Sequence, residues 1–327
     1  MAELLLNPGP TNTRFITKLY QWFGSDKCHR EQDFKVILKD LQQKLLKEAS
    51  FEREGKIAIL CGSGTAAMES MIASLAPNGT LIINAGKYGQ RAISIFNTYN
   101  IEHKVVKSKN IDDLIGCNKT RYVYFVENET STGEKYSLKK LCDLYPNAQF
   151  FIDATSAFGA SDYKLSHRIA ALSFCSNKCL QSTPGLGIVI WNAQLKKFKR
   201  TYYGDLSKYG IDELPFTLPT QSIYALNYTM SKIDNKLLFD KRRNLLITEL
   251  AKINIKCINK YPSNSIIAFK HPKMSYEELH DFLKKRKIVI YSGVEGIEKS
   301  FRISTMSVNF NKLFNKIIRS FNASCIH

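Results

Sequence analysis

Apolar positions follow two different spacings along the chain. Between Asp33 and Ala49 they fall at 34, 37, 38, 41, 45 and 46, which is the spacing of one face of an α-helix. From residue 56 the pattern changes to short apolar runs separated by helix-like segments, at residues 57–60, 81–83, 122–126, 150–152, 171–174 and 188–191. This alternation predicts a mainly parallel β-sheet covered by helices on both faces, and therefore a large α/β domain.

The pattern changes again after residue 203. A segment with Pro215 and Pro219 precedes a long helical stretch from Gln221 to about Leu250, and strand candidates at 266–269 and 289–291 lie on either side of a helix near 276–285. This arrangement predicts a smaller α+β domain packed on the first. We expect a large domain with the N-terminal segment at residues 1–235 and a small C-terminal domain at residues 236–327.

Composition places the chain among globular proteins of the cytoplasm. With 327 residues and 44% hydrophobic residues, it can bury a sizeable core. The N-terminus lacks a basic start, and its apolar run is too short for a signal peptide. None of the eight cysteines forms a Cys-x-x-Cys pair, so we expect reduced thiols and a cytoplasmic location.

The charge balance is strongly basic, with 47 Lys and Arg against 29 Asp and Glu and a net charge of +18. A nucleic acid, a membrane surface or an anionic small molecule could each account for such an excess. The basic residues are scattered over stretches that resemble solvated helix faces, and the sequence has no RNA-binding signature and no zinc-finger spacing. We therefore interpret the excess charge as a solvated surface that attracts anions in general, and expect no nucleic-acid, membrane or metal partner.

One candidate binding motif is Gly62-Ser63-Gly64-Thr65, which follows a predicted strand and opens a predicted helix. Free N–H groups at a helix N-terminus, with small residues that allow close approach, can hold a phosphate group. An ordinary helix cap explains Ser63 or Thr65 equally well. The motif is not a P-loop, because the required Gly-Lys-Ser/Thr is missing.

Two further residues follow later strands. Asp153 ends the predicted strand at 149–152, and ligands of open parallel sheets bind beyond such strand ends. Lys178 comes 25 residues later among small and apolar residues, where desolvation would lower its pKa and make it a nucleophilic amine. Asp153 could instead cap a turn, and Lys178 could extend into solvent from a loop.

Together, these positions supply what a pyridoxal 5'-phosphate site requires: a phosphate anchor, an acid for the pyridine nitrogen and a Schiff-base amine. The sequence resembles the class V, fold-type I aminotransferases, and within them most closely the 2-aminoethylphosphonate:pyruvate group. Asn128-Glu129-Thr130-Ser131-Thr132-Gly133 and Asn177-Lys178-Cys179-Leu180-Gln181 favour that group. The other matching segments are residues 5–11, 28–31, 62–69, 86–91, 152–159, 216–220 and 301–303.

The resemblance implies a role for each matching residue. Ser63, Gly64 and Thr65 hold the cofactor phosphate, joined by Thr217 from a partner subunit, which requires a homodimer. Tyr88 stacks on the pyridine ring. Thr130 and Thr155 contact the ring edge, and Asn177 adds a phosphate or backbone contact. Lys178 and Asp153 are catalytic, and Arg302 binds the substrate anion. Simpler roles stay open: core packing for Tyr88, a surface ion pair for Arg302, and a turn position for Thr217.

The implied reaction is transfer of an amino group from 2-aminoethylphosphonate to pyruvate, giving phosphonoacetaldehyde and L-alanine. The planar fork of Arg302 can grip a phosphonate or a carboxylate, so one site can serve both half-reactions. An alanine or serine:glyoxylate aminotransferase is the nearest alternative. A cysteine desulfurase fits less well, because that group has His where this chain has Tyr88 and His-Lys where it has Asn177-Lys178. A non-enzymatic basic α/β binding protein would leave Lys178 without a role.

Overall fold

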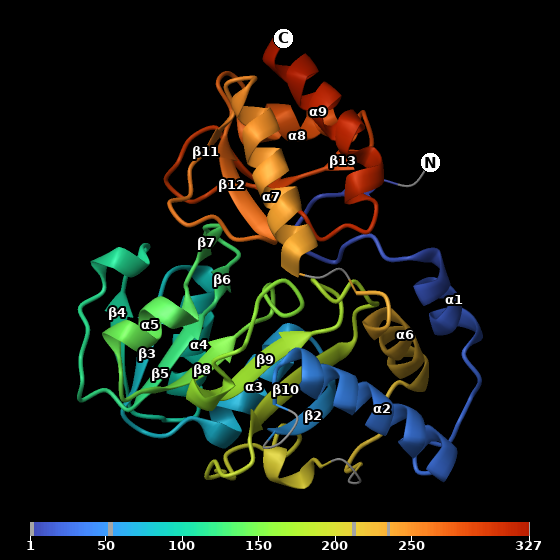
Figure 1. The fold of residues 1–327 in the computed structure, drawn as a ribbon, viewed down its shortest axis with the longest axis vertical. Coiled ribbons are helices and arrows are strands. Elements are labelled where there is room, and N and C mark those ends of the chain that lie inside the picture. The colour runs from blue at the N-terminus through green and yellow to red at the C-terminus, as the bar shows by residue number, and fades with distance from the viewer. Residues whose placement is uncertain (1–2, 52–54, 211–213, 234–235, 327) are drawn as a thin grey trace.

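The computed structural model describes residues 3–51, 55–210, 214–233 and 236–326. Figure 1 shows a wide lower unit and a smaller upper unit. The lower unit is built on a seven-stranded sheet with the order β2-β10-β9-β8-β5-β3-β4. β10 is antiparallel to both of its neighbours, and the pairs that join β9, β8, β5, β3 and β4 are parallel. The strands are β2 (Gly55–Cys61), β3 (Thr80–Asn84), β4 (His103–Lys107), β5 (Tyr122–Val126), β8 (Gln149–Asp153), β9 (Ile169–Cys175) and β10 (Leu186–Asn192). The prediction of a mainly parallel α/β sheet is confirmed.

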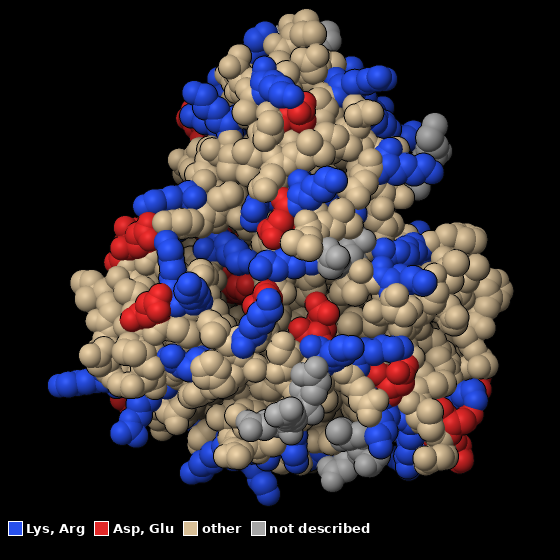
Figure 2. All heavy atoms as spheres, in the orientation of Figure 1, with Lys and Arg blue, Asp and Glu red and all other residues tan. Residues whose placement is uncertain are grey.

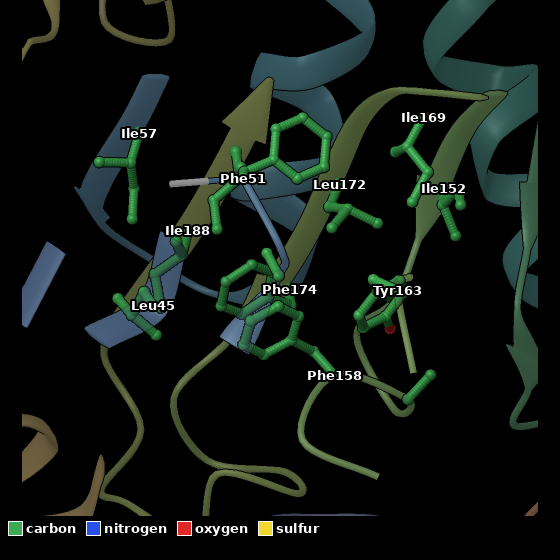
Figure 3. Packing of buried hydrophobic residues seen from close by; sticks show 14 of the residues in the cluster. Leu45, Phe51, Ile57, Ile152, Phe158, Tyr163, Ile169, Leu172, Phe174 and Ile188 are labelled. Atoms are coloured by element: carbon green, nitrogen blue, oxygen red, sulfur yellow. The ribbon is translucent and has the colours of Figure 1, made fainter. Parts of the chain in front are cut away.

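Helices cover both faces of this sheet. Successive residues of a strand point to opposite faces, and in β2 both sets are apolar. Ile57 packs with Leu45 of α2 on one face, while Leu60 packs with Met71 of α3 on the other. Figure 3 shows the first of these clusters. The helices of the lower unit are α1 (Phe15–Phe23), α2 (Gln32–Glu48), α3 (Gly64–Leu75), α4 (Lys87–Thr98), α5 (Leu138–Leu144) and α6 (Thr220–Met230).

The upper unit has a four-stranded antiparallel sheet with the order β11-β12-β15-β14. The N-terminal strand β1 (Leu4–Leu5) pairs with β13 (Ile288–Val289), and Leu4 and Leu6 join the apolar core of this unit. The predicted domain boundary at residue 235 falls outside the described residues. The other elements are α7 (Lys236–Ala251), β11 (Lys256–Cys257), β12 (Ile266–Lys270), α8 (Tyr276–Lys284), β14 (Tyr291–Ser292), β15 (Ser300–Ser304) and α9 (Phe310–Ile326).

Two elements expected as single pieces are divided. The helical stretch from Gln221 to about Leu250 consists of α6, which packs on α1 and α2, and α7, which packs on α9 and β11. α6 ends where the Ser231 hydroxyl donates to the Tyr228 carbonyl at 2.7 Å, which competes with continued helix bonding. The expected strand at 289–291 likewise divides between β13, which pairs with β1, and β14, which pairs with β15. An apolar pattern shows that residues are buried, but not at which residue the chain stops packing on one element and begins to pack on another.

Within the ranges that the structure describes, none of the helices combines the length and the apolar character of a membrane span.

Candidate active site

Three segments that are far apart in the sequence meet at one edge of the large sheet. β2 and β9 run in the same direction, because both are antiparallel to β10, and β8 is parallel to β9. Their carboxyl ends therefore lead into Gly64, Thr155 and Cys175 on the same side. A Cβ atom added to Gly64 would lie 2.8 Å from Thr155 Cγ2 and 3.4 Å from Cys175 Sγ. Only a glycine lets the start of α3 approach the other two strand ends this closely.

The start of α3 forms the phosphate-binding candidate. Ser63 is the N-cap, and its Oγ accepts a hydrogen bond from the Ala66 N–H at 3.4 Å. The first N–H groups of a helix have no partner within the helix and attract anions. Arg91 adds a positive charge, since its Nη1 donates to Thr65 Oγ1 at 2.9 Å. The Ser63-Gly64-Thr65 segment thus offers both a helix end and a guanidinium.

Arg91 was not among the candidates from the sequence. It lies three residues after Tyr88 on α4, and its guanidinium carbon is 4.8 Å from the centre of the Tyr88 ring. Residues three apart on a helix are neighbours, so this spacing could have identified Arg91 once Tyr88 was chosen. The contact places a positive charge on the face of the Tyr88 ring. Burial raises the pKa of the Tyr88 phenol above its ordinary value.

Asp153 is the last residue of β8 and is buried, with 1% of its surface exposed. Its Oδ1 accepts the Thr155 N–H at 2.9 Å, whereas Oδ2 has no hydrogen-bond partner. Burial raises the pKa of the carboxyl to about 6, against the opposing effect of the contacts with Thr155. A buried carboxylate oxygen without a donor is costly. A protonated pyridine nitrogen would donate the hydrogen bond that Oδ2 of Asp153 lacks.

Lys178 lies three residues beyond the end of β9, in a loop that brings its side chain against the N-terminal segment. Its Nζ donates a hydrogen bond to the carbonyl oxygen of Pro8. A Cβ atom added to Gly9 would lie 2.7 Å from the same Nζ, and Gly9 has a φ of +132°. Burial lowers the pKa of the Lys178 ammonium, which increases the fraction of neutral, nucleophilic amine. The matching segment 5–11 had no assigned role, and the structure places it beside Lys178.

Glu129 is a second residue whose part the sequence did not reveal. It is buried, and its carboxylate accepts the N–H groups of Gly89 at 3.2 Å, Tyr88 at 3.4 Å and Ser131 at 3.1 Å. A carboxylate at a helix N-terminus is stabilised by the helix dipole. Glu129 therefore holds the first turn of α4, and with it Tyr88, against the loop that carries Thr130.

Arg302 reaches this site from β15 in the upper unit. Only 6% of its surface is exposed, and its side chain donates to the carbonyl oxygens of Thr130 and Ser292, the latter at 2.7 Å from Nε. Thr130 Oγ1 in turn donates to Ser156 Oγ at 3.0 Å. No carboxylate of the described chain forms an ion pair with Arg302, and burial lowers the pKa of its guanidinium. A buried cation held only by neutral groups favours an anionic ligand.

The remaining two candidate residues, Asn177 and Thr217, have few side-chain contacts within the described chain. Asn177 is half-buried, and its side chain forms no hydrogen bond within the described residues. Thr217 is exposed and lies before α6, next to Phe216, whose ring packs 4.8 Å from that of Tyr203. The structure thus leaves Thr217 accessible, as contact with a second subunit would require.

Comparisons with known proteins give matches along most of the chain. The family model described as Aminotransferase class-V matches residues 87–312. Two proteins named 2-aminoethylphosphonate--pyruvate transaminase, from Bacillus cereus strains ATCC 10987 and AH187, are 26% and 28% identical to this chain. The first match covers 97% of this chain and 96% of the relative, and the second covers 93% and 92%.

Solved structures show the same fold. An aspartate aminotransferase of subgroup IV from Thermus thermophilus superposes with a TM-score of 0.88 at 21% identity, covering 99% of both chains. An alanine--glyoxylate aminotransferase from Nostoc sp. superposes with a TM-score of 0.84 at 19% identity, covering 100% of this chain and 96% of that one.

Proposed function

The chain belongs to the class V aminotransferase family, and on this basis we propose that it transfers the amino group of 2-aminoethylphosphonate to pyruvate with pyridoxal 5'-phosphate as its cofactor. The observation that supports an anionic donor most strongly is Arg302, a buried guanidinium with neutral hydrogen-bond partners. The names of the two Bacillus cereus relatives suggest the particular donor and acceptor.

The residues present fit this cofactor. The unpartnered Oδ2 of Asp153 suits a protonated ring nitrogen, and the N-terminus of α3 with Arg91 suits a phosphate group. When bound, pyridoxal phosphate supplies an electrophilic carbonyl carbon and a ring that accepts electrons. We assign the following residues to its binding: Ser63, Gly64, Thr65, Tyr88, Thr130, Asp153, Thr155, Asn177 and Lys178, with Thr217 supplied by a second subunit.

Lys178 carries the proton transfers in this proposal. Burial lowers the pKa of its ammonium, so the amine can act as a nucleophile and then as a base that takes a proton from the substrate carbon and returns it. The carbonyl of Pro8 holds Nζ in place within the described structure. Asp153 keeps the ring nitrogen protonated, because a carboxylate with a raised pKa and a free oxygen is stabilised by a cation beside it.

Arg302 orients both substrates. A guanidinium can donate two parallel hydrogen bonds to a phosphonate in one half-reaction and to a carboxylate in the other. Its contacts with the carbonyls of Thr130 and Ser292 fix the plane of the fork before a substrate arrives. This preorganisation reduces the entropy lost on binding.

We also propose a homodimer in the cytoplasm. Exposed apolar side chains on α1, among them Phe15, Trp22 and Phe23, support contact with a second copy. All eight cysteines are free thiols, which supports a reducing compartment.

The function is tested by supplying the purified protein and cofactor with 2-aminoethylphosphonate and pyruvate, and measuring L-alanine. We expect alanine to form, with the parallel lines of ping-pong kinetics. If alanine or serine with glyoxylate reacts and the phosphonate does not, the protein is a glyoxylate aminotransferase instead. Arg302→Gln serves as the matched control, since it removes the cation but keeps a side chain that can donate hydrogen bonds.

A further inference from the structure

A cavity of about 570 Å³ opens beside Arg302, outside the residues assigned to the cofactor. It lies between the start of α4, the turn after β4 and the loop at residues 293–295 of the upper unit. Two of its lining residues are covalent neighbours of site residues, since Lys87 precedes Tyr88 and Ser131 follows Thr130. Arg302 itself also lines the cavity, so an anion bound to its guanidinium would lie at the cavity wall. Figure 2 shows basic side chains gathered around the hollow between the two units.

The cavity lining is strongly cationic. Lys87, Lys107 and Lys109 line it together with Arg302, and Glu295 is the only carboxylate among the described lining residues. Glu295 lies 3.8 Å from the Nζ of Lys87. Within the part of the chain that the structure describes, Lys107 and Lys109 form no ion pair, which leaves two positive charges uncompensated. Cations around a concave surface concentrate anions there.

The two free lysines extend from a fixed turn. Ser108, between them, is buried, and its N–H donates to the Asn84 carbonyl at 3.1 Å. The Tyr136 hydroxyl donates to the Ser108 carbonyl at 2.7 Å. Lys107 also pairs with Asn84 in the parallel ladder of β3 and β4. The backbone that carries both lysines is therefore tied to the sheet, although their side chains remain exposed.

We propose that Lys107 and Lys109 give this enzyme a preference for doubly charged oxyanions, so that the site distinguishes a phosphonate from a carboxylate of similar size. The inference rests on the proposed function, because it concerns the anion that Arg302 binds. Arg302 alone offers one positive charge and can accept either anion. Lys107 and Lys109 add positive charge, and its attraction for a ligand grows in proportion to the charge of the ligand.

The size of the preference follows because the electrostatic energy is proportional to the charge of the ligand. Exposed ion pairs contribute up to about 1 kcal/mol, which corresponds to about fivefold in binding. If loss of Lys107 and Lys109 weakens a singly charged anion about threefold, Coulomb's law makes the loss for a dianion about tenfold. A fold defect caused by the substitutions would instead weaken both anions by the same factor.

The test compares methylphosphonate, which carries about −1.5 to −2 charges near pH 8, as phosphate groups do, with singly charged methanesulfonate. Both are tetrahedral oxyanions of similar size. Each is used as a competitive inhibitor of the holoenzyme and of the Lys107→Ala/Lys109→Ala variant. We expect the inhibition constant to rise about five- to tenfold for methylphosphonate and about threefold for methanesulfonate. Equal changes for the two anions, or no change for either, would overturn the proposal.

A matched control removes the same net charge elsewhere. Lys104 and Lys119 are exposed and do not line the cavity. The Lys104→Ala/Lys119→Ala variant therefore measures how much the overall net charge of +18 affects the inhibition constants. An equal effect of both double variants would also overturn the proposal. Because inhibition is measured with whichever amino donor the enzyme uses, the assay does not depend on 2-aminoethylphosphonate. If that compound is no substrate but methylphosphonate still depends on the lysines, the proposed function fails and the charge preference stands.

Discussion

Replacing Asp153 by Asn is expected to stabilise the cofactor-free protein while it removes activity. Burial raises the pKa of this carboxyl from 3.8 to about 6. Between these pH values the folded chain binds more protons than the unfolded chain, so the free energy of unfolding falls as the pH rises through this window. A pKa shift of about two units corresponds to about 3 kcal/mol of folding free energy. Wild type has lost this whole contribution to its stability above pH 7.

Asn keeps the shape of Asp and can still accept the Thr155 N–H, but it carries no charge. The cofactor-free Asp153→Asn variant should therefore be more stable than wild type by up to about 3 kcal/mol at pH 8, with the difference vanishing near pH 4. Activity should fall at least 1,000-fold. A carboxylate beside a pyridinium contributes on the order of 5 kcal/mol at an effective dielectric constant near 20, and each 1.4 kcal/mol is about tenfold in rate.

Urea unfolding of the cofactor-free proteins at pH 8, 6 and 4.5 measures the stability difference, and alanine formation measures activity. Asp162→Asn is the control, because Asp162 is exposed and its replacement should give no such pH dependence. The reasoning is refuted if Asp153→Asn is less stable than wild type at pH 8, or if its stability difference from wild type is the same at all three pH values.

Three other substitutions test separate parts of the site. Gly9→Ala places a methyl group 2.7 Å from Lys178 Nζ at a positive φ. It should lower kcat at least tenfold in steady-state kinetics and the free energy of unfolding by about 1–3 kcal/mol in urea, and an unchanged kcat would contradict the contact. Arg302→Lys keeps the charge but loses the fork, so kcat/KM should fall about 100-fold for both substrates; loss for one substrate alone would show that Arg302 does not serve both. Arg91→Gln removes the donor to Thr65, and should weaken cofactor binding about tenfold in an equilibrium titration, whereas unchanged affinity would place the phosphate elsewhere.

The strands of the large sheet other than β4 could be predicted because they are buried on both faces. Residues 122–126 and 188–191, for example, are continuous apolar runs, and both lie within observed strands. β4 was missed because it is an edge strand with exposed Lys104, Val105 and Lys107, and such edges carry charge to prevent further pairing. The antiparallel direction of β10 could not be predicted either, because an apolar run has no direction.

The candidate site could be assembled in part because its residues follow strands. Asp153 ends β8 and Lys178 follows β9, the neighbouring strand of the sheet, so their proximity follows from parallel pairing. The contact between Lys178 and the Pro8 carbonyl could not be predicted, because a backbone carbonyl has no side-chain signature and the two residues are 170 positions apart. The helix-capping role of Glu129 likewise depends on the spatial approach of α4 to a later loop.

The central claim is that Lys178 is the amine that bonds to pyridoxal phosphate. The protein is incubated with the cofactor and reduced with borohydride, which fixes a lysine–cofactor bond permanently, and its peptides are then analysed by mass spectrometry. We expect a single pyridoxyl-phosphate label on the peptide that contains Lys178, and no label in Lys178→Ala. An unlabelled wild-type protein, or a label on another lysine that persists in Lys178→Ala, would contradict the account.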